Sequence, residues 1–337
     1  MKVSVVGCGG VSKSHLRALS EMESVTISSV VDIKKERADM AAQEYNCKAY
    51  YDFDTMLSED RPDCVHICTP HYLHVPMSVK ALSEGIHVLC EKPCAISADG
   101  LSQLRLAQLM SDAQFGVCFQ NRYNESALMV KNLIDREAYG KVVSARACVH
   151  WKRDENYYND DWHGTLEKEG GGVVVNQAIH TQDLMRFIVG KKIKAVTAHV
   201  FNDHLKGVIE VEDTVYALFE HEDNITSVYN ATTAFLTNLP VLIDIFCEDA
   251  TLRLEGNNAY VIKNGTTEQL HLADNTGFIG KNYWGKGHSS LIRDFYDCIE
   301  KNRRFPIDAV EGGKAVEEFL AIFSSSASGE KIYLIKD

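Results

Sequence analysis

The stretch KVSVVGCGGVS at residues 2–12 decides the fold of the first part of the chain. Its β-branched run, from Val3 to Val6, is typical of a buried strand, and the run breaks at Gly7 into a glycine-rich turn. A helical pattern follows at 11–21. A strand, a glycine-rich turn and a helix in direct succession predict the first crossover of a doubly wound parallel sheet.

The same alternation of short strands and longer helices continues to residue 120. Further strands are expected at 25–31, 64–67, 86–90 and 115–119, and further helices at 33–45, 72–84 and 97–112. Residues 1–120 are therefore predicted to form an α/β domain with a doubly wound parallel sheet, the Rossmann arrangement.

The pattern changes after residue 141 to longer β-rich stretches separated by polar turns. Strands are expected at 141–151, 192–201, 212–220, 225–233, 240–247 and 250–255, and helices at 124–136, 176–189, 286–300 and 309–325. Residues 121–337 are predicted to form a second, α+β domain with a large and mainly antiparallel sheet.

Composition argues against several classes of protein. The chain has 337 residues, with 35 Lys and Arg against 47 Asp and Glu, and this net charge of −12 disfavours binding to nucleic acid or to an anionic membrane. No segment approaches the ~20 apolar residues of a membrane span, and the first apolar run is too short for a signal peptide, so we expect a cytoplasmic protein. The ten cysteines form no Cys-x-x-Cys pair, which favours buried, reduced thiols and no metal site.

The turn at residues 7–12 has the features of a dinucleotide-binding loop. Gly7 permits a tight turn, and Gly9 lets the backbone approach a pyrophosphate at the positive N-terminus of the next helix. Asp32 ends the following strand, where a carboxylate can accept a hydrogen bond from a ribose 2′-hydroxyl. A helix N-cap is the alternative role for Asp32. The cofactor-binding residues expected here are Gly7, Gly9, Gly10, Val11, Ser12 and Asp32.

The residues around Asp32 also bear on the choice of cofactor. A carboxylate at this position would repel a 2′-phosphate and so favours NAD over NADP. Lys34 and Lys35 lie close enough in the sequence to keep NADP open.

Two further segments are expected at the carboxyl edge of the parallel sheet, where open α/β sheets bind ligands. One follows the strand at 64–67, and the other is the run Glu91-Lys92-Pro93. Lys92 is predicted to point into the crevice, and a surface lysine paired with Glu91 is the alternative. A cis Lys92–Pro93 peptide would change the direction of this lysine. The cofactor-binding residues expected in these segments are Thr69, Pro70, His74, Glu91 and Lys92.

A second polar motif follows three consecutive glycines in the second half of the chain. The predicted helix at 176–189 carries Asn176, His180 and Asp183 at positions i, i+4 and i+7, which would place them on one face. A histidine satisfied within the core is the alternative. Because the glycines would let a ligand approach and the face carries two other hydrogen-bonding groups, a binding or catalytic role is favoured.

These motifs together resemble the glucose-fructose oxidoreductase, inositol dehydrogenase and rhizopine catabolism (Gfo/Idh/MocA) family. The resemblance rests on Gly7–Gly10, Thr69-Pro70, Glu91-Lys92-Pro93 and the segment 170–183, in this order and spacing. It implies a tightly bound NAD(P), hydride transfer to or from a sugar or cyclitol, and a second domain whose open sheet often forms an oligomer interface, here in a homodimer or homotetramer. Lys92 and His180 match the catalytic lysine and histidine of the family.

The sequence departs from the family pattern at three positions. Asn176 stands where Asp is common, Ala178 where Gly is common, and His71 where Asn often follows Thr-Pro. Asparagine cannot ionise, so it can only orient the imidazole or bind a substrate hydroxyl. The run Asn176-Gln177-x-Ile179-His180 also resembles a subset of the family that acts on sugars.

The resulting hypothesis is an NAD(P)-dependent dehydrogenase or reductase acting on a secondary alcohol or carbonyl. His180 would take the hydroxyl proton, and Lys92 would stabilise the developing alkoxide. Further substrate contacts are expected among aromatic and hydrogen-bonding side chains, for each of which core packing is the alternative. They are Arg122, Tyr123, His150, Trp151, Lys152, Trp162, His163, Tyr283, Trp284 and His288, together with Asn176.

Two other functions stay open from sequence. One is an NAD-dependent glycosidase that oxidises a sugar C3 transiently, and the other is a sensor of dinucleotide or sugar without catalysis. The presence of Lys92 and His180 argues against the sensor. A methyltransferase is disfavoured because it would give neither Glu91-Lys92-Pro93 nor the histidine motif a role.

Overall fold

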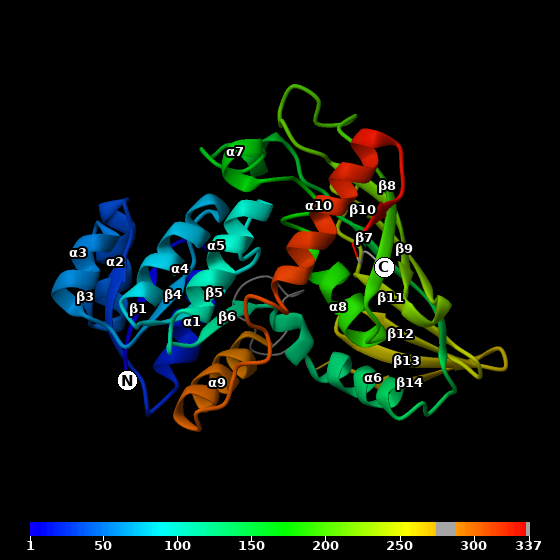
Figure 1. Ribbon diagram of the computed structural model, residues 1–337, viewed down its shortest axis with the longest axis horizontal. Coiled ribbons are helices and arrows are strands. Elements are labelled where there is room, and N and C mark those ends of the chain that lie inside the picture. Colours follow the sequence, from blue (N-terminus) through cyan, green and yellow to red (C-terminus); the bar gives the residue numbers. More distant parts are fainter. Residues whose placement is uncertain (274–286, 335–337) are drawn as a thin grey trace. The chain divides into compact units, whose positions relative to one another are not determined.

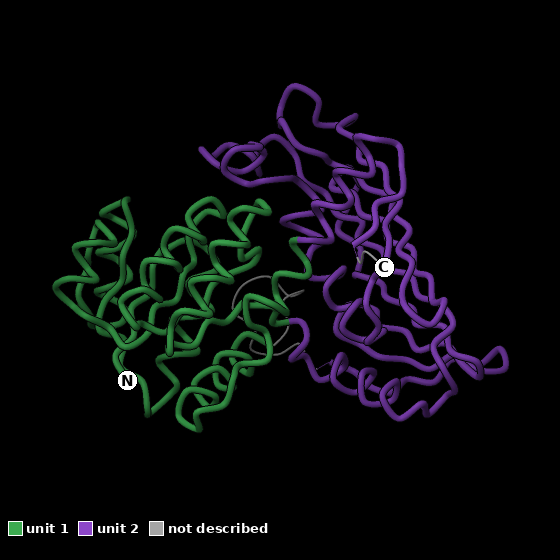
Figure 2. The backbone as a smooth tube through the Cα atoms, viewed as in Figure 1, with its two compact units in different colours: residues 1–120, 277–316 green, residues 121–276, 317–337 purple. Residues whose placement is uncertain are grey.

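The computed structural model describes residues 1–273 and 287–334 (Figure 1). The chain folds into two compact units, one of Met1–Gln120 with Gly277–Val316 and one of Asn121–Thr276 with Glu317–Asp337 (Figure 2). The chain passes from the first unit to the second after Gln120, and the segment Gly277–Val316 groups with the first unit. No helix within 1–273 or 287–334 is both long enough and apolar enough to cross a membrane.

The first unit contains a six-stranded parallel sheet with strand order β3-β2-β1-β4-β5-β6. This order confirms the doubly wound fold. The strands are β1 (Lys2–Val6), β2 (Thr26–Val31), β3 (Lys48–Tyr50), β4 (Cys64–Ile67), β5 (His87–Glu91) and β6 (Phe115–Cys118). The α-helices between them are α1 (Ser12–Ser20), α2 (Lys35–Tyr45), α3 (Phe53–Asp60), α4 (His74–Ser83) and α5 (Ala98–Leu109). β3 and α3 were not predicted from the sequence.

A buried carboxylate explains why β1 and β2 carry serines in an otherwise apolar sheet. Asp60, the last residue of α3, accepts hydrogen bonds from Ser4, Ser28 and Ser29. The hydroxyl oxygens of Ser4 and Ser29 are also 2.6 Å apart. Burial opposes the charge of Asp60, but these donors and Lys2 hold its pKa below the ordinary value. The polar group thus fastens α3 to the sheet without leaving a buried donor unsatisfied.

Helix α9 (Gly287–Glu300) belongs to the first unit because it completes the packing on β6. Gly116 of β6 faces the rings of Phe295 and Phe305, which are both fully buried. The backbone beyond α9 also pairs with the end of the sheet, since the Val117 N–H donates to the Ile307 carbonyl at 2.8 Å. These contacts explain why the unit is discontinuous in sequence.

The second unit contains a nine-stranded sheet with strand order β14-β13-β12-β11-β7-β10-β9-β8-β15. Pairing is antiparallel except between β7 and β10, which confirms the mainly antiparallel prediction. The strands are β7 (Val142–His150), β8 (Ile193–Phe201), β9 (Thr214–His221), β10 (Thr226–Thr232), β11 (Leu242–Cys247), β12 (Thr251–Glu255), β13 (Asn258–Lys263), β14 (Thr266–His271) and β15 (Ile332–Tyr333). Of these, β13, β14 and β15 were not predicted.

Helices cover one face of this sheet. Helix α8 (Ile179–Val189) packs on β7 and β11, and α6 (Glu125–Asp135) packs on β12, β13 and α8. Strands β9 and β10 alternate between buried and more exposed side chains, as expected for a sheet with one covered face. The short helix α7 (Leu166–Glu169) precedes α8, and α10 (Gly313–Ser328) follows α9.

We expect Gly116→Ala to destabilise the first unit. The added Cβ would lie 2.8 Å from Phe305 Cδ1 and 2.9 Å from Phe295 Cε2, and neither buried ring can move without disturbing its neighbours. Overpacking of this kind costs about 1–3 kcal/mol, so the urea midpoint should fall. Gly10→Ala is the matched control, because its Cβ would meet no atom within 4 Å. Equal midpoints for the two variants would contradict this account of β6 and α9.

Candidate functional site

The glycine-rich turn after β1 is shaped to admit a ligand. Gly7 has a φ of +89°, and a Cβ there would lie 2.6 Å from the Cys68 carbonyl oxygen, so this position requires glycine. A Cβ on Gly9 or Gly10 would meet nothing within 4 Å, which leaves the backbone open on that side. Ser12 begins α1 and its hydroxyl donates to the Gly9 carbonyl at 2.7 Å. The loop therefore fits a pyrophosphate approaching the N-terminus of α1.

Asp32 is tied to this turn by its own carboxylate. Oδ2 accepts the Cys8 N–H and Oδ1 accepts the Lys34 N–H, both at 2.8 Å. Lys34 rather than Asp32 is the N-cap of α2, so the alternative role of Asp32 as the helix cap does not describe the structure. The two hydrogen bonds fix the carboxylate beside the glycine-rich turn, where a ribose would lie.

His74 joins the two loops at the carboxyl ends of β4 and β5. It is fully buried, with Nδ1 2.7 Å from the Pro93 carbonyl and Nε2 2.9 Å from the Thr69 carbonyl. Burial, and secondarily the charge of Lys92, lower the pKa of His74, although its two carbonyl contacts and Glu91 oppose this. Lys92 is partly buried in the same loop, and its peptide bond to Pro93 is cis. His74 therefore supports the loop that carries Lys92.

Glu91 is the centre of a buried polar cluster that the sequence analysis missed. His15 Nε2 lies 3.0 Å from Glu91 Oε1, and His288 Nε2 lies 3.7 Å from the same oxygen. The cluster continues from His15 Nδ1 to His66 Nδ1 at 2.8 Å, and from His66 Nε2 to the Tyr296 hydroxyl at 2.9 Å. Two features of the sequence could have indicated the cluster. One is a histidine in the buried run Cys64–Cys68, and the other is a histidine in the first turn of α1.

Counting donors and acceptors assigns the hydrogen bonds of this cluster when the His15 ring is neutral. An ionised Glu91 can only accept, so His15 donates from Nε2 and then accepts at Nδ1 from His66. His66 then accepts at Nε2 from the Tyr296 hydroxyl. Burial lowers the pKa of His66 strongly, which keeps its ring neutral. Burial would raise the pKa of Glu91, but the neighbouring imidazoles of His15 and His288 hold it well below the ordinary value.

Four side chains of this cluster are also of types that bind metals. The ligand atoms of His15, Glu91, Cys118 and His288 lie within 4.8 Å of one another, and all four residues are buried. We expected no metal from the sequence, whereas the structure shows a group that could hold one. The hydrogen bonds of Glu91 account for the arrangement without a cation, and we assign it no metal. His288, expected among the substrate contacts, is instead buried against Glu91.

In the second unit, Glu212 shapes the turn that follows the three glycines. Its Oε1 accepts the N–H groups of Gly172 and Val174, each at 2.9 Å. A Cβ on Gly172 would lie 2.0 Å from the Glu212 carbonyl oxygen, so no larger residue fits there. Burial raises the pKa of Glu212 to about 7, although the two backbone donors oppose the shift.

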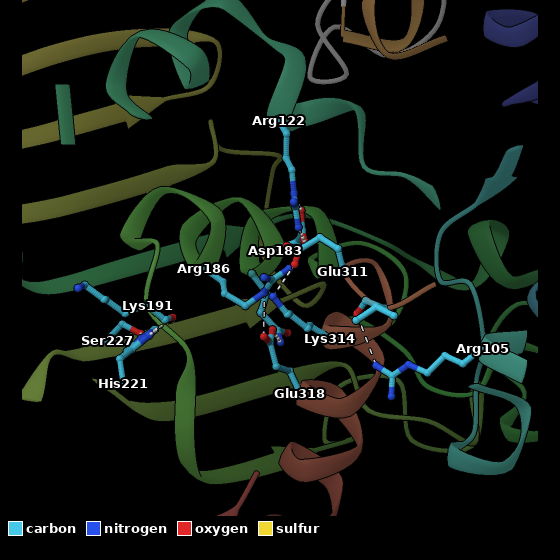
Figure 3. A network of polar contacts seen from close by, with 12 residues as sticks. Arg105, Arg122, Asp183, Arg186, Lys191, His221, Ser227, Glu311, Lys314 and Glu318 are labelled. Carbon is cyan, nitrogen blue, oxygen red and sulfur yellow. Dashed lines mark hydrogen bonds and ion pairs between the residues drawn. The ribbon is translucent and has the colours of Figure 1, made fainter. Parts of the chain in front are cut away.

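Helix α8 begins at Ile179, three residues later than predicted, so Asn176 lies in the preceding turn. Asp183 does not join Asn176 and His180 in a ligand-facing stripe. Its carboxylate is buried and receives Arg122 Nε at 2.7 Å and Arg186 Nη2 at 2.8 Å (Figure 3). Arg186 also pairs with the buried Glu318, with 2.9 Å between Nε and Oε1. Asp183 and Arg122 therefore anchor α8 within the second unit.

Asn176 and His180 are partly exposed within a stretch of buried neighbours. The Nδ2 of Asn176 donates to Glu169 Oε1 at 2.6 Å. The other carboxylate oxygen of Glu169 accepts the Gly164 N–H. Glu169, which is fully buried, thus connects the turn before α8 to the aromatic loop before α7.

The remaining predicted substrate residues lie in several settings. Trp162 and His163 have ring centroids 3.7 Å apart, and His163 hydrogen-bonds to Asp160 in the same loop. Trp151 is buried, and its indole N–H donates to the Leu239 carbonyl at 3.1 Å. Tyr123 ends the 3-10 helix Gln120–Tyr123. Tyr283 and Trp284 lie outside the described residues.

Comparison with known families matches both parts of the chain. Residues 1–117 match the GFO/IDH/MocA model described as an oxidoreductase family with an NAD-binding Rossmann fold. Residues 127–253 match the GFO/IDH/MocA C-terminal domain.

Individual relatives align over nearly the whole chain. A 2,7-anhydro-N-acetylneuraminate hydratase of Mediterraneibacter gnavus is 23% identical over 96% of this chain and 90% of its own. A D-glucoside 3-dehydrogenase of Escherichia coli is 22% identical over 99% of this chain and 97% of its own. The WlbA dehydrogenase of Bordetella pertussis, solved with NADH and UDP-GlcNAcA, is 25% identical, with a TM-score of 0.87 over 100% of this chain and 99% of that one.

We expect Glu212→Gln to remove a pH-dependent loss of stability. The pKa of Glu212 is raised to about 7 in the folded protein, so its contribution to stability is lost as pH rises from the unfolded pKa of 4.5 through 7. Glutamine stays neutral, and its carbonyl oxygen can accept both N–H bonds. The free energy of unfolding of the variant, relative to wild type, should rise by about 1–3 kcal/mol between pH 5 and 7.5 and then level off.

Urea denaturation at a series of pH values measures this difference. Glu268→Gln, at an exposed position on β14, is the control and should show no such trend. A pH-independent difference between Glu212→Gln and wild type would show that Glu212 titrates as an ordinary carboxylate.

Proposed function

The chain belongs to the GFO/IDH/MocA family of NAD-dependent oxidoreductases, and from this premise we propose that it transfers a hydride between NAD(H) and a secondary hydroxyl or carbonyl of a sugar, sugar derivative or cyclitol. The observation that carries the proposal is that each unit has a glycine-rich turn with polar side chains beside it. The first unit has an open glycine-rich turn with Asp32 fixed beside it and Lys92 at the carboxyl edge of the sheet. The second has Asn176 and His180 partly exposed after a glycine-rich turn.

We assign the cofactor to the first unit. The backbone of residues 7–12 would hold the pyrophosphate, and the Asp32 carboxylate would accept the ribose 2′-hydroxyl. Thr69, Pro70 and the loop supported by His74 would face the nicotinamide side. The cofactor, when bound, supplies the hydride acceptor or donor. NAD is preferred over NADP because the carboxylate of Asp32 would repel a 2′-phosphate.

His180 and Lys92 are the proposed catalytic residues. Oxidation of an alcohol requires a group that takes the hydroxyl proton as the hydride leaves, and the imidazole of His180 can take it. The ammonium of Lys92 would stabilise the developing negative charge on the oxygen. In the reductive direction the same groups would return the proton.

Side chains near this turn suit a polyhydroxylated substrate. Asn176 offers an amide, and Trp162 and His163 offer neighbouring aromatic rings, tilted by 34°, in a loop connected to it through Glu169. Tyr123 and Trp151 remain further proposed contacts. The WlbA relative binds UDP-GlcNAcA and the E. coli relative is named for a glucoside, which supports a sugar or sugar derivative.

We also propose a homo-oligomer, dimer or tetramer, that uses the uncovered face of the nine-stranded sheet. Apolar side chains on adjacent strands remain exposed there. They are Val143 of β7, Tyr216 and Leu218 of β9, and Val228 of β10, between 39% and 56% exposed. Burial of these side chains would stabilise an interface.

A second function is favoured by one relative, the hydratase of M. gnavus, whose name describes no net oxidation. An enzyme of that kind would oxidise a sugar transiently and regenerate NAD. Glycosidases that oxidise C3 transiently belong to the same class. Product formation without net NADH would distinguish this class from a dehydrogenase.

The direct test is absorbance of NADH with the purified protein and a panel of aldoses, cyclitols and nucleotide sugars. We expect turnover with one class, and a loss of roughly 10²–10⁴-fold in His180→Ala. Lys92→Ala should abolish the signal. Lys301→Ala and His204→Ala, at exposed positions, are matched controls and should behave as wild type. Wild-type turnover in His180→Ala would refute its role, and NAD binding without any turnover would favour the non-oxidative class.

Cofactor preference is tested by Asp32→Ser. Removal of the carboxylate should raise the ratio of kcat/KM with NADP to that with NAD by about tenfold or more, which corresponds to about 1.4 kcal/mol. Asp39→Ser removes the same charge from an exposed position on α2 and should leave the ratio unchanged. An unchanged ratio in Asp32→Ser would mean that Asp32 serves only to hold the turn.

A further inference from the structure

We propose that Glu169 is a positioning residue that sets the polarity of Asn176, so that the site presents the amide oxygen to a substrate hydroxyl. This inference rests on the proposed function, because it takes Asn176 as part of the substrate site. It assigns the recognition of a hydroxyl donor to Asn176 and the control of that recognition to Glu169.

The hydrogen bonds of Glu169 leave its carboxylate no freedom. One oxygen accepts the Gly164 N–H, a backbone group that can only donate. The other oxygen lies 2.6 Å from Asn176 Nδ2. An ionised carboxylate only accepts, so the NH2 end of the Asn176 amide must face Glu169, and Oδ1 must face the opposite way.

The surroundings hold Glu169 in this position. It is fully buried, it is the last residue of α7, and Gly170 ends that helix with a φ of +84°. Its partner Gly164 is equally constrained, with a φ of +75° and with Ile209 Cγ2 2.6 Å from where a Cβ would lie. The side chain at 176 is therefore oriented by a rigid support.

This arrangement gives a reason for asparagine at position 176. An aspartate there would place two carboxylates at hydrogen-bond distance, and they could coexist only by sharing a proton. Asparagine accepts a substrate O–H through Oδ1 without competing with His180 for a proton.

A pair of reciprocal variants tests the coupling. In Glu169→Gln the side-chain oxygen must stay on the Gly164 N–H, so its NH2 faces residue 176 and the Asn176 amide must turn to present Nδ2 to the substrate. We expect kcat/KM to fall roughly 10- to 100-fold, mostly through KM, for the substrate identified in the panel. In Asn176→Asp two carboxylates meet, so activity should fall further as pH rises.

The double variant Glu169→Gln with Asn176→Asp should restore a hydrogen bond between residues 169 and 176 that leaves an acceptor oxygen facing the substrate. The glutamine NH2 then donates to the aspartate, whose other oxygen accepts the substrate hydroxyl. Its kcat/KM should recover to within a few-fold of wild type and lose the pH trend. Glu167→Gln, at an exposed position on the same short helix, is the control and should be neutral. Wild-type kcat/KM in Glu169→Gln, or no recovery in the double variant, would overturn the proposal.

An activity-independent readout separates this inference from the proposed function. In protein labelled with 15N-asparagine, the Asn176 side-chain NH2 signal is assigned by its absence in Asn176→Asp. Bonded to a buried carboxylate, it should exchange with solvent slowly in wild type and at least tenfold faster in Glu169→Gln. Equal exchange rates would refute the orientation even if no polyol is turned over, and slow exchange without turnover would refute only the proposed function.

Discussion

Carboxylates that accept backbone N–H groups hold the loops on which this protein depends. Asp32 accepts the Cys8 N–H at the first glycine-rich turn, Glu169 accepts that of Gly164, and Glu212 accepts those of Gly172 and Val174. A turn rich in glycine has little side-chain packing to define it and a large conformational entropy to lose. A carboxylate held in place fixes the conformation of such a turn by accepting its N–H groups. The loops can then keep exposed backbone for a ligand while holding one shape.

Much of the fold follows from sequence periodicity, and the exceptions have physical causes. The strands around Val3–Val6 and Cys64–Ile67 are mostly apolar runs without polar alternation, which predict a sheet covered on both faces, and all of these residues are buried. β3 has three residues and β14 is mostly polar and exposed, so neither carries a hydrophobic period. Sequence order gives no sign that Phe295 and Phe305 pack on Gly116, because a contact between residues nearly 200 positions apart leaves no local pattern.

The site was predictable where a motif determines backbone geometry, and less so where tertiary partners decide. The turn at Gly7 and the carboxylate at Asp32 have the geometry that their spacing predicts. Asp183, in contrast, shares a helical period with His180, but Arg122 and Arg186 bind its carboxylate. The partners of Glu91 come from α1 and α9. His288 of α9 is nearly 200 residues from Glu91 in the sequence, so no local pattern connects the two. Helical spacing gives the direction of a side chain but not the charge it meets.

The discontinuous first unit has a consequence for biosynthesis. When the ribosome has made residues 1–120, the sheet has all six strands, but Gly116 still lacks its aromatic cover and Glu91 and His66 still lack His288 and Tyr296. A buried carboxylate that still lacks His288 would be costly, so the nascent unit stays open at β6 until residues 287–307 have been translated, after strands β7 to β14 of the second sheet. The order of synthesis therefore makes strands β7 to β14 of the second unit available before the first unit closes, while β15 and most of α10 follow afterwards.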